Sequence, residues 1–205
     1  MLPKDIIVID GFYSKPDQVR NVALNTKYNT FGDEQNFPGA ESEKPFYSST
    51  IKEQFEDLIE KKIKISPEKY VFGKFRYSTK HNIAKTKVHL DHGIGWTGIV
   101  YLSKDQDSKG GMGIYKHRKL ELMEAPNQEQ LRSLQCDNVI EFDAKYVYPI
   151  TKSKNEWELL HEIPIKYNRL ILFKGCKYFH GITEQFGDSI NNSRLSQNFF
   201  FHELE

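Results

Sequence analysis

The feature that most constrains the fold of this chain is a series of short segments rich in β-branched and aromatic residues, which runs from Tyr70 to His202. Glycine and polar turn residues separate these segments, as they do in β-sandwiches, jelly rolls and barrels. The predicted strands cover Tyr70–Tyr77, Lys87–Asp91, Thr97–Ser103, Gly113–Lys116, Trp157–Ile165, Arg169–Phe173 and Arg194–His202. We therefore expect a mainly β core over residues 68–205.

Residues 1–67 differ in character, and we expect them to form a helical and loop elaboration that packs on this core. The elements predicted there are a strand over Ile6–Ile9, a helix from Ser14 to Asn25 and a helix from Thr50 to Ile63. Residues 28–49 show no periodicity and predict a long loop, either a lid or plain surface wrapping. A helical insertion is expected over Ala125–Gln135. At 205 residues, a single domain over residues 1–205 is the simplest organisation.

The charge balance argues against a partner that is recognised through a strong electrostatic field. Twenty-nine Lys and Arg residues stand against 28 Asp and Glu residues, a formal net charge of +1, so a nucleic-acid partner is disfavoured and no membrane partner is expected. No stretch approaches the roughly 18 apolar residues of a membrane span. We expect a soluble, cytoplasmic protein. Cys136 and Cys176 cannot form a disulfide scaffold, although one bridge between them stays open.

The candidate chemistry begins with two residues of one predicted strand, His89 and Asp91. Because side chains alternate along a strand, these two point to one face, while Leu90 and His92 point to the other. A third ligand is available from His180. Two imidazoles and one carboxylate are the set with which non-haem iron(II) oxygenases hold their metal. The alternative is that the histidines are hydrogen-bonded structural residues.

A second motif lies at the start of the last predicted strand. Arg194 and Ser196 share a face of that strand, so a guanidinium and a hydroxyl would point together into a cavity. An inward arginine is costly unless it is paired, which makes a bound dicarboxylate a natural partner. The alternative places Arg194 in solvent on an edge strand.

Taken in order, these motifs resemble the iron(II)- and 2-oxoglutarate-dependent dioxygenases, and most of all their prolyl-hydroxylase-like branch. The resemblance covers about residues 70–202 and rests on His89-x-Asp91, the run Tyr101–Asp107 followed by Gly110-Gly111, Phe173–Gly175, His180 and Arg194-x-Ser196. It implies a double-stranded β-helix core of the jelly-roll or cupin-like type. It also implies Fe(II), 2-oxoglutarate as co-substrate and O2, with succinate and CO2 released as a C–H bond is hydroxylated.

The resemblance assigns roles to single residues. The iron ligands of the family, and with them the catalytic centre, are matched by His89, Asp91 and His180. Arg194 matches the residue that pairs with the distal carboxylate of 2-oxoglutarate, and Ser196 is a second contact. Tyr101 matches a tyrosine that helps to bind that carboxylate. Tyr77 resembles a tyrosine upstream of the first ligand, and its alternative is an aromatic ring in the core.

The sequence near these motifs suggests a small-molecule or peptide substrate. Trp96 would form an aromatic wall or else belong to the core, and residues 31–47 would fold over the opening. Basic residues flank the motifs at Lys80, His81, Lys85 and Lys87, and again at Tyr115–Lys119. They would attract an anionic substrate, unless they form an ordinary solvated face. One departure from the family is an insertion, Phe186–Asn192, between His180 and Arg194.

Two alternative functions stay open at this stage. A non-catalytic metal-binding β-helix module would keep the same ligands without turnover. An AlkB-like nucleic-acid demethylase would share the metal and co-substrate. Those enzymes resemble this chain but carry a further arginine a few residues after the one matched by Arg194, and the corresponding stretch here, Gln197–Phe201, contains none. The oligomeric state is left open.

Overall fold

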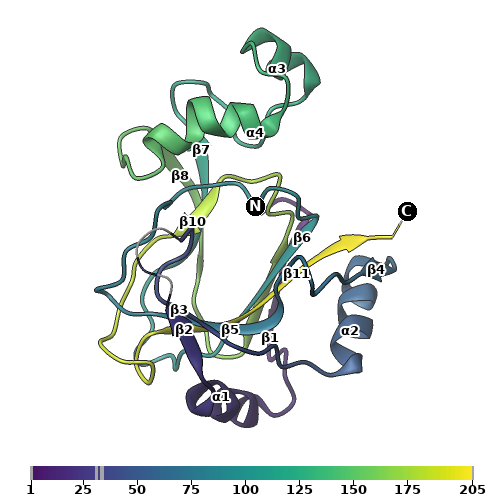
Figure 1. The fold of residues 1–205 in the computed structure, drawn as a ribbon, viewed down its shortest axis with the longest axis vertical. Helices are drawn as coiled ribbons and strands as arrows, with labels where there is room; N and C mark the ends of the chain where they lie inside the picture. The colour runs from purple at the N-terminus through teal and green to yellow at the C-terminus, as the bar shows by residue number, and fades with distance from the viewer. Residues whose placement is uncertain (1, 31, 33–34, 205) are drawn as a thin grey trace.

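Two antiparallel sheets face each other and carry the helices on their outer surfaces (Figure 1). This arrangement is seen in a computed structural model that describes residues 2–30, 32 and 35–204. The chain is thus mainly β with a jelly-roll-like core, which confirms the fold class predicted from the sequence.

The larger sheet comprises eight strands of the described chain. Their order is β1 (Ile6–Asp10), β9 (Arg169–Phe173), β6 (Trp96–Tyr101), β11 (Arg194–Glu203), β5 (Phe72–Ser78), β3 (Ala40–Ser42) and β2 (Tyr28–Thr30), while β4 (Ile63–Lys64) pairs with one end of β11. The long strand β11 lies between β6 and β5, and its register places Ser196 opposite both Tyr101 and Arg76.

The smaller sheet consists of β10 (His180–Ile182), β7 (Gly111–His117) and β8 (Trp157–Pro164). The chain around His89 runs beside β10, and His89 and His180 exchange two backbone hydrogen bonds of 3.0 Å each. This pairing places His89 and His180, which are 91 positions apart in the sequence, on adjacent stretches of backbone.

The core between the sheets is built by alternation along the strands. Ile99 and Phe173 of the larger sheet meet Met112 and Ile114 of the smaller one, and all four are buried. Alternate residues of the same strands face outward, where the helices cover them.

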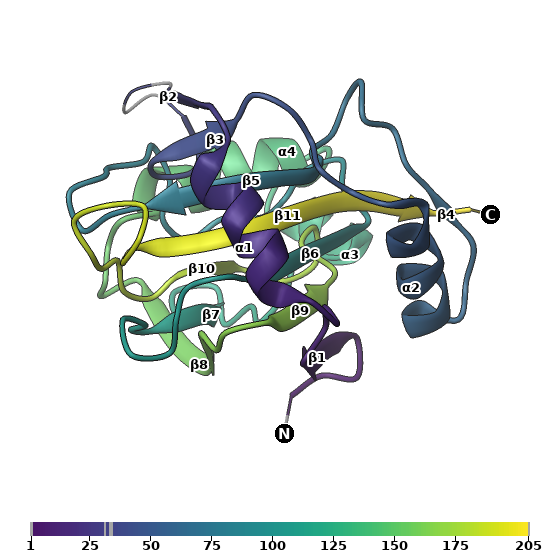
Figure 2. The same cartoon turned by 90° about the horizontal axis from the view of Figure 1, so that it is seen from below.

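Two helices cover the larger sheet. Figure 2 shows α1 (Pro16–Asn25) across its outer face and α2 (Ser49–Ile59) beside the end of β11 that pairs with β4. Ala23 of α1 packs with Leu195, and the Phe55 ring of α2 lies 5.1 Å from that of Phe199.

A helical insertion covers the outer face of the smaller sheet (Figure 1). It comprises α3 (Gln128–Ser133), α4 (Val139–Phe142), a π-helical turn (Asp143–Val147) and a 3-10 turn (Tyr148–Ile150). Phe142 packs there against Phe179, which precedes His180. In the described part of the chain, no helix combines the length and apolar character needed to cross a bilayer.

Several local predictions were wrong, for physical reasons. The helix from Thr50 begins at Ser49 and ends at Ile59, because Glu60 adopts a left-handed conformation with φ of 55° and Ile63 then joins β4. Residues 87–91 form a single bridge instead of a strand, and residues 28–49 contain β2 and β3 as well as loop. Residues 1–67 therefore add four strands to the larger sheet, beside their helices. The bridge between Cys136 and Cys176 that the sequence left open is not formed, and both residues are free thiols.

Glu203 joins three elements and makes the fold sensitive to acid. Its carboxylate accepts hydrogen bonds from Lys61 Nζ at 2.6 Å and Trp96 Nε1 at 2.8 Å, and pairs with Lys174 Nζ at 3.1 Å. The Lys61 and Trp96 hydrogen bonds lower the pKa of Glu203 to about 2, whereas an unfolded glutamate has a pKa of about 4.3. The ionised carboxylate therefore stabilises the folded state above pH ~5, and this contribution is lost as the pH falls toward 2.

We expect Glu203→Gln to lower the melting temperature at pH 7 and to have a much smaller effect near pH 2, where Glu203 is protonated in the unfolded state and about half protonated in the folded state. Thermal melts of the two proteins across this pH range measure the difference. Glu53→Gln, which changes an exposed glutamate on α2, is the matched control. A difference that stays constant with pH would contradict the assignment.

Candidate metal centre and adjoining cavity

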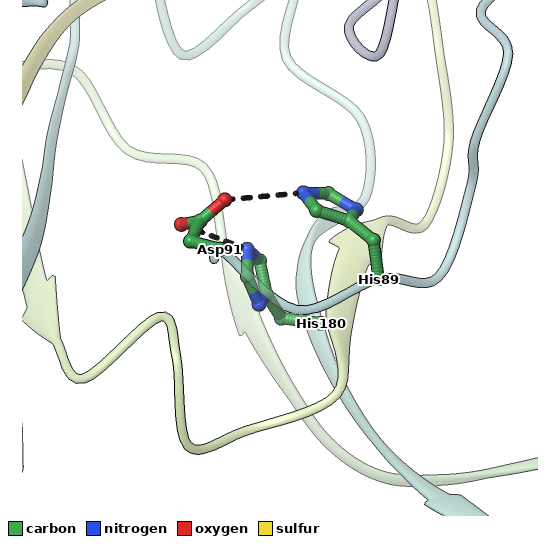
Figure 3. A group of neighbouring side chains, drawn as sticks. All are labelled: His89, Asp91 and His180. Carbon is green, nitrogen blue, oxygen red and sulfur yellow. Dashed lines mark ion pairs between the residues drawn. The ribbon is translucent and has the colours of Figure 1, made fainter. Parts of the chain in front are cut away.

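His89, Asp91 and His180 converge between the two sheets, with their ligand atoms all within 4.8 Å of one another. His89 Nε2 lies 3.5 Å from Asp91 Oδ1, and His180 Nε2 lies 3.4 Å from Asp91 Oδ2 (Figure 3). Leu90, between the first two, points away into the core under the helical insertion, as strand alternation predicts. The structure thus brings together the three residues that the sequence singled out.

Backbone carbonyls orient both imidazoles. His180 Nδ1 lies 2.8 Å from the Tyr178 carbonyl oxygen, and His89 Nδ1 lies 3.3 Å from that of Lys87. A hydrogen bond at Nδ1 fixes the ring and leaves Nε2 free to bind a metal. Both Nε2 atoms accordingly face the Asp91 carboxylate.

Thr97 and Gly175 hold the carboxylate in place. Thr97 Oγ1 donates a hydrogen bond of 2.6 Å to Asp91 Oδ2, and the Asp91 backbone N–H donates one of 3.0 Å to the Gly175 carbonyl. A Cβ atom on Gly175 would lie 2.3 Å from Asp91 Oδ2 and 2.4 Å from Thr97 Oγ1. Only glycine at position 175 leaves room for this arrangement.

The electrostatics keep Asp91 ionised. Burial opposes ionisation, but the charges of and hydrogen bonds from His180 and His89 outweigh it and hold the pKa of Asp91 well below its usual range. Burial likewise disfavours the His89 imidazolium, yet Asp91 raises the pKa of His89 overall. A carboxylate and two imidazoles on one side of a point form a donor set that fits a divalent first-row metal and leaves coordination positions open.

We expect Thr97→Val to weaken metal binding by about 10- to 100-fold, because loss of a hydrogen bond to a ligand carboxylate typically has this effect. A competition titration with a chromophoric chelator measures the affinity. Thr97→Ser keeps the hydroxyl and should restore binding to near the wild-type level. Equal affinities for the valine and serine variants would show that Thr97 does not position Asp91.

Arg194 lies in the wall of the same cavity and is 8% exposed. Its guanidinium carbon is 5.3 Å from the centre of the Tyr101 ring. Among the described residues, Arg194 Nε and Tyr101 Oη have no hydrogen-bond partner, and no carboxylate pairs with Arg194. Ser196 is fully buried and accepts a hydrogen bond from Asn198 Nδ2. Unpaired buried donors of this kind fit an incoming carboxylate.

Tyr77, by contrast, does not face the metal ligands. Its ring packs edge-on against Tyr28, 4.9 Å away, in the cluster beneath α1, although the residue also borders the cavity. On β5 it alternates with Arg76 and Ser78, so its side chain occupies the opposite face of the sheet. The ring of Tyr77 thus belongs to the core cluster beneath α1, which is the alternative that the sequence left open, and its role as a co-substrate contact stays a prediction.

Trp96 also lies away from the cavity. It is buried in the outer cluster covered by α2 and donates to Glu203, so it is a core residue and not an aromatic wall. His92 points away from the site, with its Nε2 3.3 Å from Asp143 Oδ2 in the helical insertion. This matches the face that strand alternation predicts.

The cavity has a volume of about 400 Å³. It also contains a residue that sequence reasoning missed, Arg76 on β5, whose guanidinium is held by Glu41 of β3. Burial lowers the pKa of Arg76, and the charge of Glu41 opposes that effect. Strand alternation with Ser78 would have placed Arg76 on the inner face of the sheet. Its partner Glu41, however, lies in residues 28–49, which the sequence predicts to be a loop.

Three of the basic residues predicted at the mouth pair with carboxylates of neighbouring residues. Lys80 pairs with Asp188 at 2.7 Å, Lys116 pairs with Glu121, and Arg118 lies 3.7 Å from Glu158. Of the predicted basic residues, Lys87 lines the cavity.

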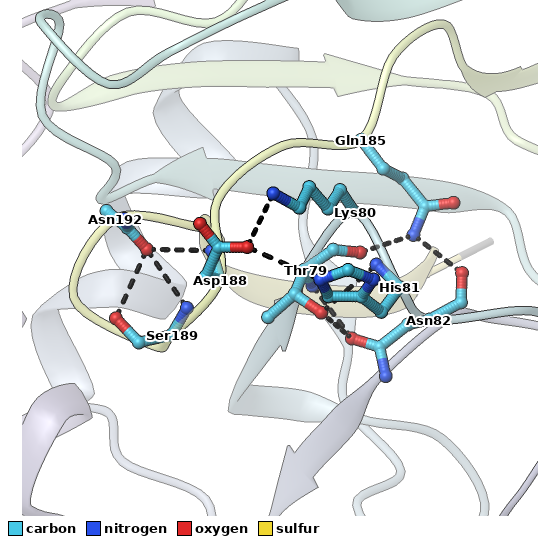
Figure 4. A network of polar contacts seen from close by, with 8 residues as sticks. All are labelled: Thr79, Lys80, His81, Asn82, Gln185, Asp188, Ser189 and Asn192. Atoms are coloured by element: carbon cyan, nitrogen blue, oxygen red, sulfur yellow. Dashed lines mark hydrogen bonds and ion pairs between the residues drawn. The ribbon is translucent and has the colours of Figure 1, made fainter.

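The insertion Phe186–Asn192 folds onto the turn that follows β5 (Figure 4). Gln185 Nε2 donates to the carbonyls of Thr79 and Asn82 at 3.0 Å each, and Asn192 Oδ1 accepts the backbone N–H groups of Asp188 and Ser189. This network anchors the chain immediately before Arg194.

Part of the predicted lid borders the opening. Residues Asn36–Pro38 line the cavity, and the Lys85 N–H and Thr86 hydroxyl bind the carbonyls of Gln35 and Asn36. Phe31, Asp33 and Glu34, in the same predicted loop, lie outside the described residues.

Comparisons with known proteins bear on the fold and on the family. No curated protein matches the sequence. Among solved structures, the chain is similar to HygX from Streptomyces hygroscopicus, a structure with nickel and 2-oxoglutarate bound, with a TM-score of 0.51 and 11% sequence identity. The similarity covers 97% of this chain and 83% of HygX, and it supports the shared fold. Residues 3–201 match the family described as a family of unknown function, DUF6445, and the chain therefore belongs to this family.

Proposed function

We propose that this protein is an Fe(II)- and 2-oxoglutarate-dependent oxygenase that hydroxylates a C–H bond of a small molecule or of an amino-acid or peptide side chain. The observation that carries the proposal is the presence, in one cavity, of the His89, Asp91 and His180 donor set and of a buried arginine without a carboxylate partner among the described residues. HygX, with a similar fold, binds 2-oxoglutarate and nickel, which supports the same pair of ligands here.

The residues divide into two binding groups. His89, Asp91 and His180 would hold the metal, and Arg194, Tyr101 and Ser196 would hold the distal carboxylate of 2-oxoglutarate. When bound, the iron and 2-oxoglutarate supply the oxidising chemistry with O2, and succinate and CO2 are released.

The remaining contribution of the chain is to fix geometry and exclude water. Thr97 holds Asp91 in one orientation, while the carbonyls of Lys87 and Tyr178 hold the imidazoles. The buried side chains of Ile99 and Met112 form an apolar wall of the cavity. Such a wall strengthens the attraction between Arg194 and a carboxylate by excluding solvent.

Succinate release from 2-oxoglutarate tests the proposal directly. The full-length protein, loaded with Fe(II) and supplied with O2, is expected to form succinate, and pools of amino acids, peptides and metabolites that increase the rate would contain the substrate. Under anaerobic conditions, Fe(II) and 2-oxoglutarate together should produce a visible charge-transfer band. Metal binding with neither the band nor succinate would instead favour a non-catalytic binding module.

A further inference from the structure

The charges around the cavity are unequal. Four basic side chains, those of Arg76, Lys87, Lys152 and Arg194, line it, whereas Asp91 is the single carboxylate among the described lining residues. A bound metal and 2-oxoglutarate would neutralise Asp91 and Arg194. Arg76, Lys87 and Lys152 would remain beside the space left for a substrate.

Arg76 is placed for recognition by two constraints. Glu41 Oε2 accepts hydrogen bonds from Arg76 Nε and lies 2.8 Å from one of its terminal nitrogens, which fixes one edge of the guanidinium. The flat face of the guanidinium stacks on Phe37, 3.8 Å from the ring centre, and lies 5.4 Å from the ring of Phe200. A guanidinium held in this way loses little entropy when it binds a further anion.

The pairing register separates Arg76 from Arg194, although it places Arg76 opposite Ser196. On the larger sheet Arg76 is paired with Ser196, and Arg194 with Ser78, so the two arginines project from different rows of the sheet. Arg76 extends toward Phe200, which is paired with Thr97, the residue that holds Asp91. The Arg76 guanidinium thus extends from the row of Ser196 toward Phe200, whereas the Arg194 guanidinium lies over the Tyr101 ring.

Glu41 does not cancel the positive charge at this site. Its carboxylate also pairs with Lys74 at 3.1 Å, so the group of Lys74, Arg76 and Glu41 keeps one net positive charge. At the mouth, no acidic partner pairs with Lys87 or Lys152 in the described chain. Apolar side chains lie among these charges, namely Phe37, Ile83 and Phe200, and Ile83 is 56% exposed at the opening.

We propose that Arg76, with Lys87 and Lys152, binds the carboxylate of an anionic substrate whose apolar body packs against Phe37, Phe200 and Ile83. The planar fork of an arginine suits a carboxylate, which it can grip through two parallel hydrogen bonds. The inference rests on the proposed function for the reaction, and it adds the class of substrate, a small organic acid with an apolar body.

The test compares acids with their neutral amides. Phenylacetate, 3-phenylpropanoate and hexanoate, each beside its amide, are titrated calorimetrically into the metal-free protein and into the protein loaded with Ni(II) and 2-oxoglutarate. At least one acid is expected to bind about tenfold or more tightly than its amide. The double variant Glu41→Gln/Arg76→Met removes the guanidinium together with the carboxylate that pairs with it. Lys74 keeps its charge in this variant but does not line the cavity, so the acid preference should disappear.

Two further variants make the result specific. Lys87→Gln/Lys152→Gln should reduce the acid preference about threefold or more. Lys154→Gln, at an exposed lysine that does not line the cavity, should leave it unchanged. Asp10→Asn/Arg169→Met removes an ion pair between the ends of β1 and β9, outside the cavity, and is the matched control for the loss of a charge pair. Arg194→Gln is expected to weaken 2-oxoglutarate binding while the acid preference remains.

The outcomes separate this inference from the proposed function. Equal binding of every acid and its amide, or an acid preference that survives Glu41→Gln/Arg76→Met, would overturn the Arg76 site. A loss of 2-oxoglutarate affinity in that variant as large as in Arg194→Gln would overturn it too, because Arg76 would then belong to the co-substrate site. Absence of succinate release alongside an intact acid preference would count against the oxygenase proposal alone.

Discussion

Replacement of His180 by alanine is expected to abolish metal binding at this centre. His180 Nε2 faces Asp91 Oδ2 from 3.4 Å, and the residue is 5% exposed, so its loss removes one of three candidate ligands from a buried site. Loss of a group that only orients a ligand weakens binding about 10- to 100-fold. Loss of a ligand itself should therefore weaken binding by at least about 100-fold.

Metal affinity is measured by competition with a chromophoric chelator, and the anaerobic Fe(II) and 2-oxoglutarate band provides a second measurement. His81→Ala is the matched control, because that imidazole is 70% exposed and contacts Asp188 outside the centre. Thermal melts of the metal-free proteins establish that the variant is folded. If folded His180→Ala bound metal as tightly as His81→Ala, the three residues would not be the metal ligands.

Arg194→Gln is expected to leave metal binding intact and to weaken 2-oxoglutarate binding by roughly 10- to 100-fold. Hydrogen bonds to a charged group contribute about 1.5–3 kcal/mol, and each 1.4 kcal/mol corresponds to tenfold in affinity. The buried position of Arg194 beside Tyr101 places this interaction away from bulk water.

The dependence of the charge-transfer band on 2-oxoglutarate concentration gives the affinity. Arg118→Gln removes an exposed arginine outside the cavity and controls for a general change in charge. Tyr101→Phe should show a smaller loss in the same direction, because it removes one neutral hydroxyl. An unchanged affinity in Arg194→Gln would place 2-oxoglutarate elsewhere and leave this arginine without a role.

Much of the candidate centre follows from alternation along strands. A period of two is enough to put His89 and Asp91 on one face and Leu90 on the other, although the segment forms one bridge and no regular strand. The same rule places Arg194 inside, and the structure finds it buried in the cavity wall. These predictions needed local sequence alone.

The parts of the site that the sequence left open or missed depend on pairing between distant segments. Tyr77 and Arg76 are neighbours in the chain, and a shift of one position exchanges the inner and outer faces. The register of β5 against β11 settles the choice, with Arg76 opposite Ser196 and Tyr77 opposite Leu195. The role of Glu41 as the partner of Arg76 could not be predicted for a related reason. Its strand, β3, has only three residues with Gly and Pro on either side, so it shows no hydrophobic periodicity of its own.

The two histidines of the centre are fixed by the sheet before any ion arrives. Their backbones are hydrogen-bonded to each other and their rings to neighbouring carbonyls, so chain folding alone assembles the pocket. A rigid pocket of nitrogen and oxygen donors cannot reject a competing ion by changing shape, and nickel, copper and zinc bind such donors at least as tightly as ferrous iron does. Under the proposed function, the metal that occupies the site would then depend on the supply where the protein folds, and material produced under other conditions would have to be reconstituted with iron before the succinate assay.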